Sequence, residues 1–212
     1  MATAIKICGI STVEALDAAI DERADYVGFV FFPPSPRHVD RQAASALAMR
    51  AGSRIGRVGL FVNAPDNQIS EAVEASRLDA LQLHGKETPQ RVSEVKNRFG
   101  LPVWKAISVA SEHDVQRAST YRDAADLLLF DAKTPEDAAL PGGMGLRFDW
   151  SLLDQWKGRD GWGLAGGLTP ENVGQAVAMA KPPLVDTSSG VESAPGIKDA
   201  ARIRAFCRAV QG

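Results

Sequence analysis

Short runs of apolar residues alternate with amphipathic segments from one end of this 212-residue chain to the other. The runs have the length of strands, and the amphipathic segments repeat their apolar positions at helical spacing. Predicted strands cover residues 4–9, 25–32, 57–62, 79–83, 102–107, 126–131, 162–165 and 183–186. The pattern therefore predicts a protein in which strands and helices follow one another in turn.

Polar residues at helix starts and glycines at helix ends mark the helices between these strands. Ser11 and Glu14 predict a capping box at the start of one helix, and Ser111 predicts the start of another. Thr88 and Thr169 are each followed by proline, which is favoured at the first helical position. Predicted helices include residues 41–51, 66–76, 89–99 and 198–210, and another begins near residue 150.

Strand–helix units that repeat without a linker-like break predict a single (β/α)₈ TIM barrel with parallel strands, as one domain over residues 1–212. The chain is shorter than the roughly 250 residues typical of this fold, so its loops are expected to be short. A doubly wound open sheet is the alternative. No Gly-x-Gly-x-x-Gly turn follows the first strand, which argues against a dinucleotide-binding sheet of that kind.

The first strand is informative because side chains alternate between the two faces of a strand. Ile5 and Ile7 share one face and are expected to pack against outer helices. Lys6 and Cys8 share the other face and are expected to point into the barrel. Cys8 then lies at the carboxyl end of its strand, where such barrels carry their chemistry.

Net charge, cysteine content and the length of apolar runs limit the binding partners and the cellular compartment to be expected. A formal net charge of -2 gives no support for nucleic-acid binding. Cys8 and Cys207 lie at opposite ends of the chain and fit neither a disulfide framework nor a metal site, so we expect a cytoplasmic protein. The longest apolar run, residues 27–32, is far below the roughly 20 residues that cross a bilayer, and no membrane association is expected. Monomer and homodimer both stay open.

Small residues follow the last two predicted strands. Gly166 and Gly167 follow the seventh strand, and Ser188, Ser189 and Gly190 follow the eighth. Small residues let backbone N–H groups approach an anion, and loops at these two positions bind phosphate in many barrels. Tight turns are the structural alternative. Because both loops have this composition, a small phosphorylated ligand such as a sugar phosphate is favoured.

Cys8 and Asp131 are the candidates for proton transfer. A free thiol has a pKa of about 8.5 and needs a nearby cation to act as a strong base at neutral pH, and Lys6 is the candidate for that cation. Asp131 ends an apolar strand, where partial burial favours the neutral carboxyl of a general acid. A buried structural thiol and a loop cap or salt bridge are the structural alternatives.

Three further polar residues fall on the same side of the predicted barrel. Arg37 lies in a proline-rich loop, and its planar fork suits a carboxylate. Gln82 and His84 share a face at the end of the fourth strand and are candidates to bind substrate, although a lone histidine is more typically structural. Cys8, His84 and Asp131 would also suit a nucleophilic set, but no helix N-terminus or second cation is evident to stabilise a thiolate.

Six short motifs contain these residues. They are Lys6-Ile-Cys-Gly-Ile10, Ser35-Pro-Arg-His-Val39, Gln82-Leu-His-Gly85, Leu129-Phe-Asp131, Ala165-Gly-Gly-Leu168 and Asp186-Thr-Ser-Ser-Gly-Val-Glu192. In this order they resemble the motifs of the phosphoribosylanthranilate isomerase family. The resemblance runs from about Ile5 to Asp199, and the first and last motifs are specific in combination.

The resemblance implies a (β/α)₈ barrel enzyme of tryptophan biosynthesis. Such an enzyme converts N-(5-phosphoribosyl)anthranilate into a 1-deoxyribulose phosphate by an Amadori rearrangement, without a metal or organic cofactor. By the same likeness Cys8 is the general base and Asp131 the general acid. Arg37 would hold the anthranilate end of the substrate, and the loops at Gly167 and at residues 188–190 would hold its phosphate.

One loop departs from the family. Residues 142–145 read Gly-Gly-Met-Gly, where the family usually has Gly-Gly-Thr-Gly. Met144 lacks a hydroxyl, which puts in doubt a polar contact to substrate but neither proton-transfer residue. The surrounding loop, residues 132–146, is rich in glycine and proline and is the predicted lid.

Two other functions remain as alternatives. An isomerase of another phosphoribosyl compound, as in histidine biosynthesis, would by resemblance use paired aspartates at the ends of strands one and six. Cys8 stands in place of the first of these. A non-catalytic barrel that binds a phosphorylated metabolite is disfavoured, because Cys8, Asp131 and both phosphate loops are intact.

Overall fold

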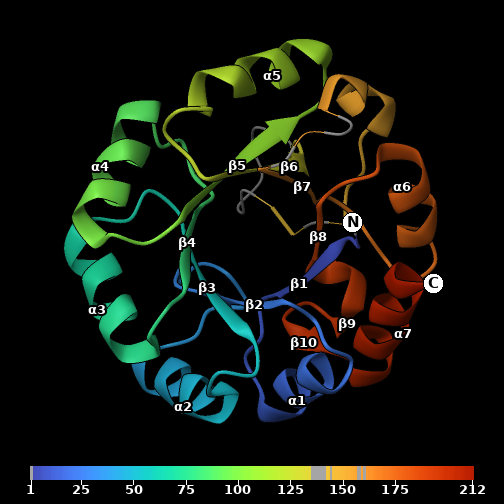
Figure 1. Ribbon diagram of the computed structural model, residues 1–212. Coiled ribbons are helices and arrows are strands. Elements are labelled where there is room, and N and C mark those ends of the chain that lie inside the picture. Colours follow the sequence, from blue (N-terminus) through green and yellow to red (C-terminus); the bar gives the residue numbers. More distant parts are fainter. Residues whose placement is uncertain (1, 135–141, 144, 157–158, 160) are drawn as a thin grey trace.

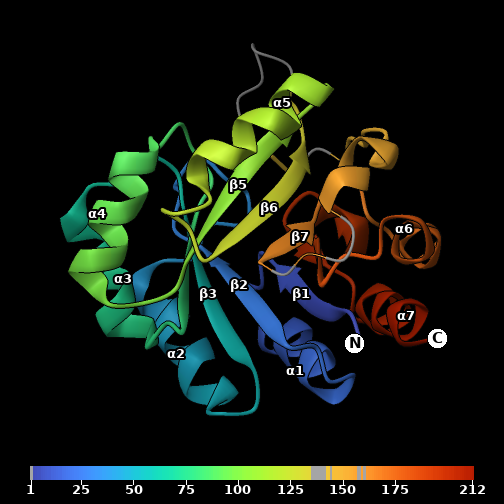
Figure 2. The same cartoon turned by 45° about the horizontal axis from the view of Figure 1, so that its top comes forward.

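The structure, a computed structural model, is a closed barrel of parallel strands surrounded by helices (Figure 1). It describes residues 2–134, 142–143, 145–156, 159 and 161–212. The strands pair in sequence order, and β1 (Ala4–Cys8) pairs with both β2 (Tyr26–Val30) and β8 (Leu184–Thr187), which closes the ring. Figure 2 shows the helices outside the barrel wall. The predicted (β/α)₈ barrel is confirmed.

The other elements follow in the predicted order. The remaining barrel strands are β3 (Gly56–Phe61), β4 (Ala80–Leu83), β5 (Val103–Val109), β6 (Leu127–Ala132) and β7 (Trp162–Leu164). The α-helices are α1 (Val13–Asp21), α2 (Arg41–Ala51), α3 (Asp66–Ser76), α4 (Pro89–Phe99), α5 (Glu112–Arg117), α6 (Val173–Ala180) and α7 (Ala200–Gln211). A 3₁₀ helix, η2 (Trp150–Trp156), stands where an α-helix was predicted to begin near residue 150. None of the helices in the described part of the chain has the length and apolarity to cross a membrane.

The helices α2, α3 and α4 begin and end where the sequence predicts. The hydroxyl of Thr88 accepts a hydrogen bond from the backbone N–H of Arg91 at 3.2 Å, and Gly100 ends α4 with φ +64. Ser111 and Asp114 form a capping box at the start of α5. Local sequence decides the starts of α4 and α5, because each side-chain cap satisfies an N–H group that the first turn leaves free.

Three predicted helix starts are wrong. The helix α7 begins at Ala200, and residue 198, where it was predicted to begin, lies in a short strand. Thr12, one residue after Ser11, caps α1 with its side chain. The helix α6 begins at Val173 and not directly after Thr169. The side-chain oxygen of Asn172 accepts a hydrogen bond from the backbone N–H of Thr169 at 2.9 Å, which stabilises a turn ahead of the helix.

A short antiparallel hairpin between β8 and α7 was not predicted. Its strands are β9 (Glu192–Ala194) and β10 (Ile197–Lys198). Strands of this length are too short to show the alternation of apolar and polar positions that identifies a strand. The hairpin adds two charged side chains to the carboxyl end of the barrel.

The alternation predicted for β1 is confirmed. Ile5 and Ile7 belong to the large apolar core between the barrel and the helices. Cys8 packs inside the barrel with Val30 and Leu60. Lys6, which is fully buried, forms an ion pair inside the barrel instead of joining an apolar cluster.

The barrel interior is apolar toward the amino ends of the strands and polar toward their carboxyl ends. The apolar cluster there contains Val58, Ala80, Trp104, Leu129 and Leu184, and Ala165 packs on it from the carboxyl end of β7. On β1, β4 and β8 the inward positions further along the strands carry Lys6, Gln82 and Asp186. Bulky branched residues usually fill such barrels, so this buried polar layer is a departure that points to function.

Gly28 on β2 leaves the space that Cys8 and Lys6 occupy. A Cβ added to Gly28 would lie 2.9 Å from Cys8 Sγ and 3.2 Å from Lys6 Nζ. Both distances are too short for ordinary contact, and the neighbours are packed inside the barrel. The thiol and the ammonium therefore depend on a glycine in the adjacent strand.

We expect Gly28→Ala to lower the free energy of unfolding by about 1–3 kcal/mol, because extra atoms in a filled core force side chains from their rotamers. Denaturant unfolding measures this change. Gly174→Ala is the matched control, since its added Cβ would meet the carbonyl oxygen of Ala209 at 3.5 Å, an ordinary contact on a helix. Equal stability of Gly28→Ala and the wild type would contradict the close packing.

Candidate functional site

A pocket lies at the carboxyl ends of the barrel strands. It encloses about 790 Å³, including its open mouth, which is within the size range of small-molecule sites. All the residues predicted for the site contribute to its lining: Cys8, Arg37, Gln82, His84, Asp131, Gly167, Ser188, Ser189 and Gly190. The barrel thus brings together strand ends and loops that are far apart in the sequence. The roles of these residues remain predictions.

Cys8 lies above a buried ion pair. Lys6 Nζ donates to Asp186 Oδ1 at 2.9 Å, and the side chains are 0% and 7% exposed. Lys6 belongs to β1 and Asp186 to β8, so the pair joins the first and last strands of the barrel. Lys6 thus neutralises an interior carboxylate, and the same ammonium lies beside the thiol.

The electrostatic environment of Cys8 is dominated by burial. Burial raises the pKa of its thiol above the ordinary value, Lys6 and Lys198 act to lower it, and Asp186 adds to the rise. For Lys6, burial acts to lower the pKa, but Asp186 and Cys8 outweigh it and raise the pKa above its ordinary value. Lys6 therefore keeps its charge. Cys8 is mostly protonated at neutral pH and strongly basic when ionised.

Asp131 at the end of β6 faces a histidine from β4. Its Oδ2 lies 3.2 Å from His84 Nε2, and its Oδ1 accepts a hydrogen bond from the backbone N–H of Ala132 at 2.8 Å. On the other side of the ring, Gln82 Nε2 is 3.0 Å from His84 Nδ1. With the amide nitrogen donating to Nδ1, the neutral ring carries its proton on Nε2 and donates it to Asp131. His84 therefore has two partners, Gln82 from its own strand and Asp131 from β6.

A second buried ion pair supports the chain around His84. Lys105 Nζ lies 3.1 Å from Glu87 Oε2, and both side chains are almost fully buried. Lys105 also donates to the carbonyl oxygens of Leu83 and Gly85, the residues on either side of His84. Glu87 accepts a hydrogen bond from the backbone N–H of Gly85. The turn that carries His84 is thereby fixed from both sides.

The two glycine- and serine-rich loops meet at the pocket. Gly167 has φ +60, and a Cβ on Gly190 would overlap the carbonyl oxygen of Leu168, so the backbones approach too closely for larger residues. The backbone N–H groups of Gly167, Ser189 and Gly190 donate to no residue that the structure describes. Free N–H groups that face a pocket from adjacent loops suit an anion.

Arg37 is held by a carboxylate from the hairpin. Its Nε and Nη2 donate to the two carboxylate oxygens of Glu192 at 2.7 and 2.9 Å, and Nη2 also donates to the carbonyl oxygen of Gly143 at 3.0 Å. Within the described ranges, Nη1 has no hydrogen-bond partner. Arg37 is buried, and it also lines the pocket. Its Nη1 is therefore available to a ligand.

The sequence analysis missed three buried charged groups at this end of the barrel: Asp186, Glu192 and Lys198. Asp186 had a usable signal, because it alternates with Leu184 on the inward face of β8. Glu192 ends the last of the six motifs but was given no role, and Lys198 had no signal, since both lie in the unpredicted hairpin. Met144 and residues 135–141 of the predicted lid lie outside the described residues. In the part of the chain that is described, no cluster of His, Cys, Asp and Glu side chains could hold a metal ion.

A closed parallel barrel with a polar pocket at the carboxyl ends of its strands is the architecture of the (β/α)₈-barrel enzymes. Comparison with known proteins identifies the group. The chain belongs to the N-(5′-phosphoribosyl)anthranilate isomerase family, whose model, described as N-(5'phosphoribosyl)anthranilate (PRA) isomerase, matches residues 5–209.

Curated relatives and solved structures agree with this family. The N-(5'-phosphoribosyl)anthranilate isomerase of Paracoccus denitrificans is 53% identical over 97% of this chain and 96% of its own length. The one from Paramagnetospirillum magneticum is 51% identical over 100% of this chain and 99% of its own. A phosphoribosyl anthranilate isomerase structure from Thermotoga maritima is similar with a TM-score of 0.88 at 38% identity, covering 99% of both chains.

We expect the Cys8 thiol to titrate above the roughly 8.5 of an unperturbed cysteine, because burial outweighs the two nearby lysines. The ultraviolet absorbance of the thiolate, followed as the pH is raised, gives the midpoint, and Cys8→Ala provides the blank. Cys207 contributes little over this range, since burial raises its pKa to about 12. A midpoint below the ordinary value would show that the lysines and not burial control the thiol.

Proposed function

We propose that this chain isomerises N-(5′-phosphoribosyl)anthranilate to 1-(2-carboxyphenylamino)-1-deoxyribulose 5-phosphate in tryptophan biosynthesis, with Cys8 as general base and Asp131 as general acid. The reaction follows from membership of the isomerase family. The assignment of roles is carried by one observation: a thiol, a carboxyl and two phosphate-type loops line the same pocket. A related isomerase has been solved in complex with reduced 1-(o-carboxyphenylamino)-1-deoxyribulose 5-phosphate, with a TM-score of 0.85 at 35% identity, covering 99% of both chains.

Asp131 opens the sugar ring in the proposed mechanism. Its protonated carboxyl gives a proton to the furanose oxygen, the bond between C1 and that oxygen breaks, and a protonated imine forms between C1 and the anthranilate nitrogen. The backbone N–H of Ala132 contacts one oxygen of this carboxyl group, and Nε2 of His84 contacts the other. The side chain is therefore fixed before substrate arrives, as efficient proton transfer requires.

Cys8 then removes the proton on C2 of the sugar. The imine withdraws electrons from C2, so a thiolate is basic enough to take this proton. The electron pair moves into the bond between C2 and C1, and the charge on nitrogen is neutralised to give an enamine that carries a hydroxyl on C2. Loss of the hydroxyl proton and protonation of C1 give the ketone. The net change is an internal redox isomerisation and needs no outside oxidant or reductant.

Arg37 and the paired loops bind the two charged ends of the substrate. Nη1 of Arg37 has no partner among the described residues and suits the ring carboxylate. The free N–H groups of Gly167, Ser189 and Gly190, with Ser188 beside them, suit the phosphate. Gln82 and His84 line the pocket between these ends and orient Asp131.

We also propose that the chain acts in the cytoplasm as one domain over residues 1–212. Its two cysteines are free and buried, which suits a reducing compartment. Monomer and homodimer both fit, and a relative from Thermotoga maritima is described as dimeric. The proposed partner is the phosphorylated small molecule alone, without nucleic acid, metal or organic cofactor.

Cys8→Ala and Asp131→Asn are each expected to lower kcat by about 10²–10⁴-fold, the usual contribution of a positioned acid or base. The substrate is generated in place from anthranilate and phosphoribosyl pyrophosphate, and its decay is followed by fluorescence against an uncatalysed control. Cys207→Ala is the control variant, because this thiol lies on α7 and packs into the apolar core, away from the pocket.

Near-normal turnover by Cys8→Ala would show that another group is the base. Tight binding of product by the wild type without turnover would favour a non-catalytic binder. Turnover of the histidine-pathway intermediate in its place would favour the other phosphoribosyl isomerase.

A further inference from the structure

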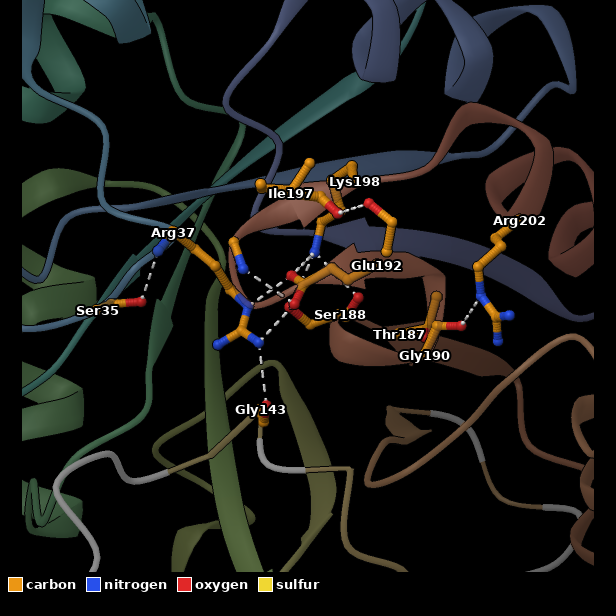
Figure 3. Close-up of polar contacts among 12 residues, drawn as sticks. Ser35, Arg37, Gly143, Thr187, Ser188, Gly190, Glu192, Ile197, Lys198 and Arg202 are labelled. Carbon is orange, nitrogen blue, oxygen red and sulfur yellow. Dashed lines mark hydrogen bonds and ion pairs between the residues drawn. The ribbon is translucent and has the colours of Figure 1, made fainter.

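The β9–β10 hairpin places two oppositely charged side chains directly behind Arg37 (Figure 3). Glu192 and Lys198 come from its two strands, and their side chains are 4% and 1% exposed. Among the described residues that line the pocket, Arg37 is present and these two are absent. They form a second layer behind the residue proposed to bind the substrate carboxylate.

Glu192 fixes the orientation of the guanidinium. Its two oxygens accept from Nε and Nη2 of Arg37 at 2.7 and 2.9 Å, a two-point contact that defines the plane of the group. The contact uses one edge of the guanidinium and leaves Nη1 toward the pocket. An arginine held in this way loses little freedom when it binds a ligand.

Lys198 supplies the positive charge that balances Glu192. Its Nζ lies 2.6 Å from Glu192 Oε1 and within 3.0 and 3.2 Å of the carbonyl and hydroxyl oxygens of Ser188. Three acceptors around one nitrogen match the three donors of an ammonium group. Two cations and one anion leave the cluster with a formal charge of +1. Without Lys198, Glu192 would neutralise Arg37.

The cluster joins both ends of the pocket. Lys198 connects Glu192 to Ser188 in the phosphate-type loop, and Glu192 connects to Arg37 in the proline-rich loop. The turn of the hairpin lies against the proline-rich loop that carries Arg37, because a Cβ on Gly196 would overlap the carbonyl oxygen of Pro36. The backbone N–H of Gly196 also donates to Glu192 at 3.1 Å.

We propose that Glu192 and Lys198 are positioning residues for Arg37: Glu192 fixes the plane of its guanidinium, and Lys198 keeps the cluster positive so that the guanidinium can bind a carboxylate. The inference rests on the proposed role of Arg37 at the anthranilate end. It assigns neither residue a contact with substrate.

The protonation state of Glu192 agrees with this arrangement. Burial acts to raise the pKa of its carboxyl, but the hydrogen bonds from Arg37 and the charge of Lys198 outweigh it and hold the pKa below its ordinary value. Burial lowers the pKa of Lys198, and the contact with Glu192 opposes that shift. With Glu192 ionised, the three acceptors around Lys198 favour its charged form.

The test compares two ligands that differ only in the ring carboxylate. One is reduced 1-(o-carboxyphenylamino)-1-deoxyribulose 5-phosphate, and the other is the same compound without the carboxyl group. Calorimetry gives both dissociation constants, and their ratio measures the carboxylate preference apart from phosphate binding. We expect a clear preference in the wild type and a loss of about tenfold in Glu192→Asp and in Lys198→Met, the size of one charge-assisted hydrogen bond.

The variants separate geometry from charge. Glu192→Asp keeps every charge but shortens the side chain by one methylene group, so it changes the geometry of the contacts of Glu192, the two-point contact with Arg37 among them, and not the charge of the cluster. Lys198→Met removes the balancing charge but leaves Glu192 on Arg37. Glu22→Asp is the matched control, because Glu22 accepts the same two-point contact from Arg208 at 3.1 and 2.7 Å on the surface, where α1 ends. Its ratio is expected to equal that of the wild type.

If folded Glu192→Asp has the same ratio of dissociation constants as the wild type, Glu192 does not position Arg37. If Lys198→Met does not fold, the result for Glu192→Asp decides on its own. An unchanged ratio in folded Lys198→Met overturns the charge-balancing role. A wild type that binds both ligands equally would instead refute the proposed carboxylate contact of Arg37. Turnover lost without a change in the ratio would show a general structural defect.

Discussion

The buried ion pair between Lys6 and Asp186 is the interaction on which the rest of the site depends. It joins the first and last strands of the barrel at 2.9 Å, and it places an ammonium beside the Cys8 thiol. Loss of one partner would leave an uncompensated buried charge, which typically costs about 3–5 kcal/mol. The environment of the thiol therefore depends on this contact, which also links the paired strands β1 and β8, and Gly28 provides the room for it.

Paired buried charges recur around the pocket. The pair of Lys105 with Glu87 holds the turn that carries His84, and the Glu192 cluster holds Arg37. In each case a side chain that lines the pocket is fixed by ionic or backbone contacts from behind. Such support keeps polar groups in place without the flexibility of exposed loops. The buried ion pairs therefore hold in place the side chains that line the pocket.

The sequence predicted the barrel, most helix boundaries and part of the pocket lining, because these follow from local periodicity and from the fixed alternation of a strand. Cys8 and Asp131 were identified by their places at strand ends. The contact of Arg37 with Glu192 was beyond prediction, since it joins residues 155 positions apart and one lies in a three-residue strand. At Thr169 a side-chain contact from Asn172 overrode a cap signal that was locally sound.

The most direct test of the mechanism compares two midpoints measured on the wild-type protein. The first is the pH at which the Cys8 thiol ionises, and the second is the midpoint of one limb of the kcat/KM profile. If the thiolate is the base and the Asp131 carboxyl the acid, kcat/KM depends on both groups, and one limb of the profile has the same midpoint as the thiol, above the ordinary range of a thiol. A kcat/KM that stays constant while the thiol titrates would show that Cys8 is not the base.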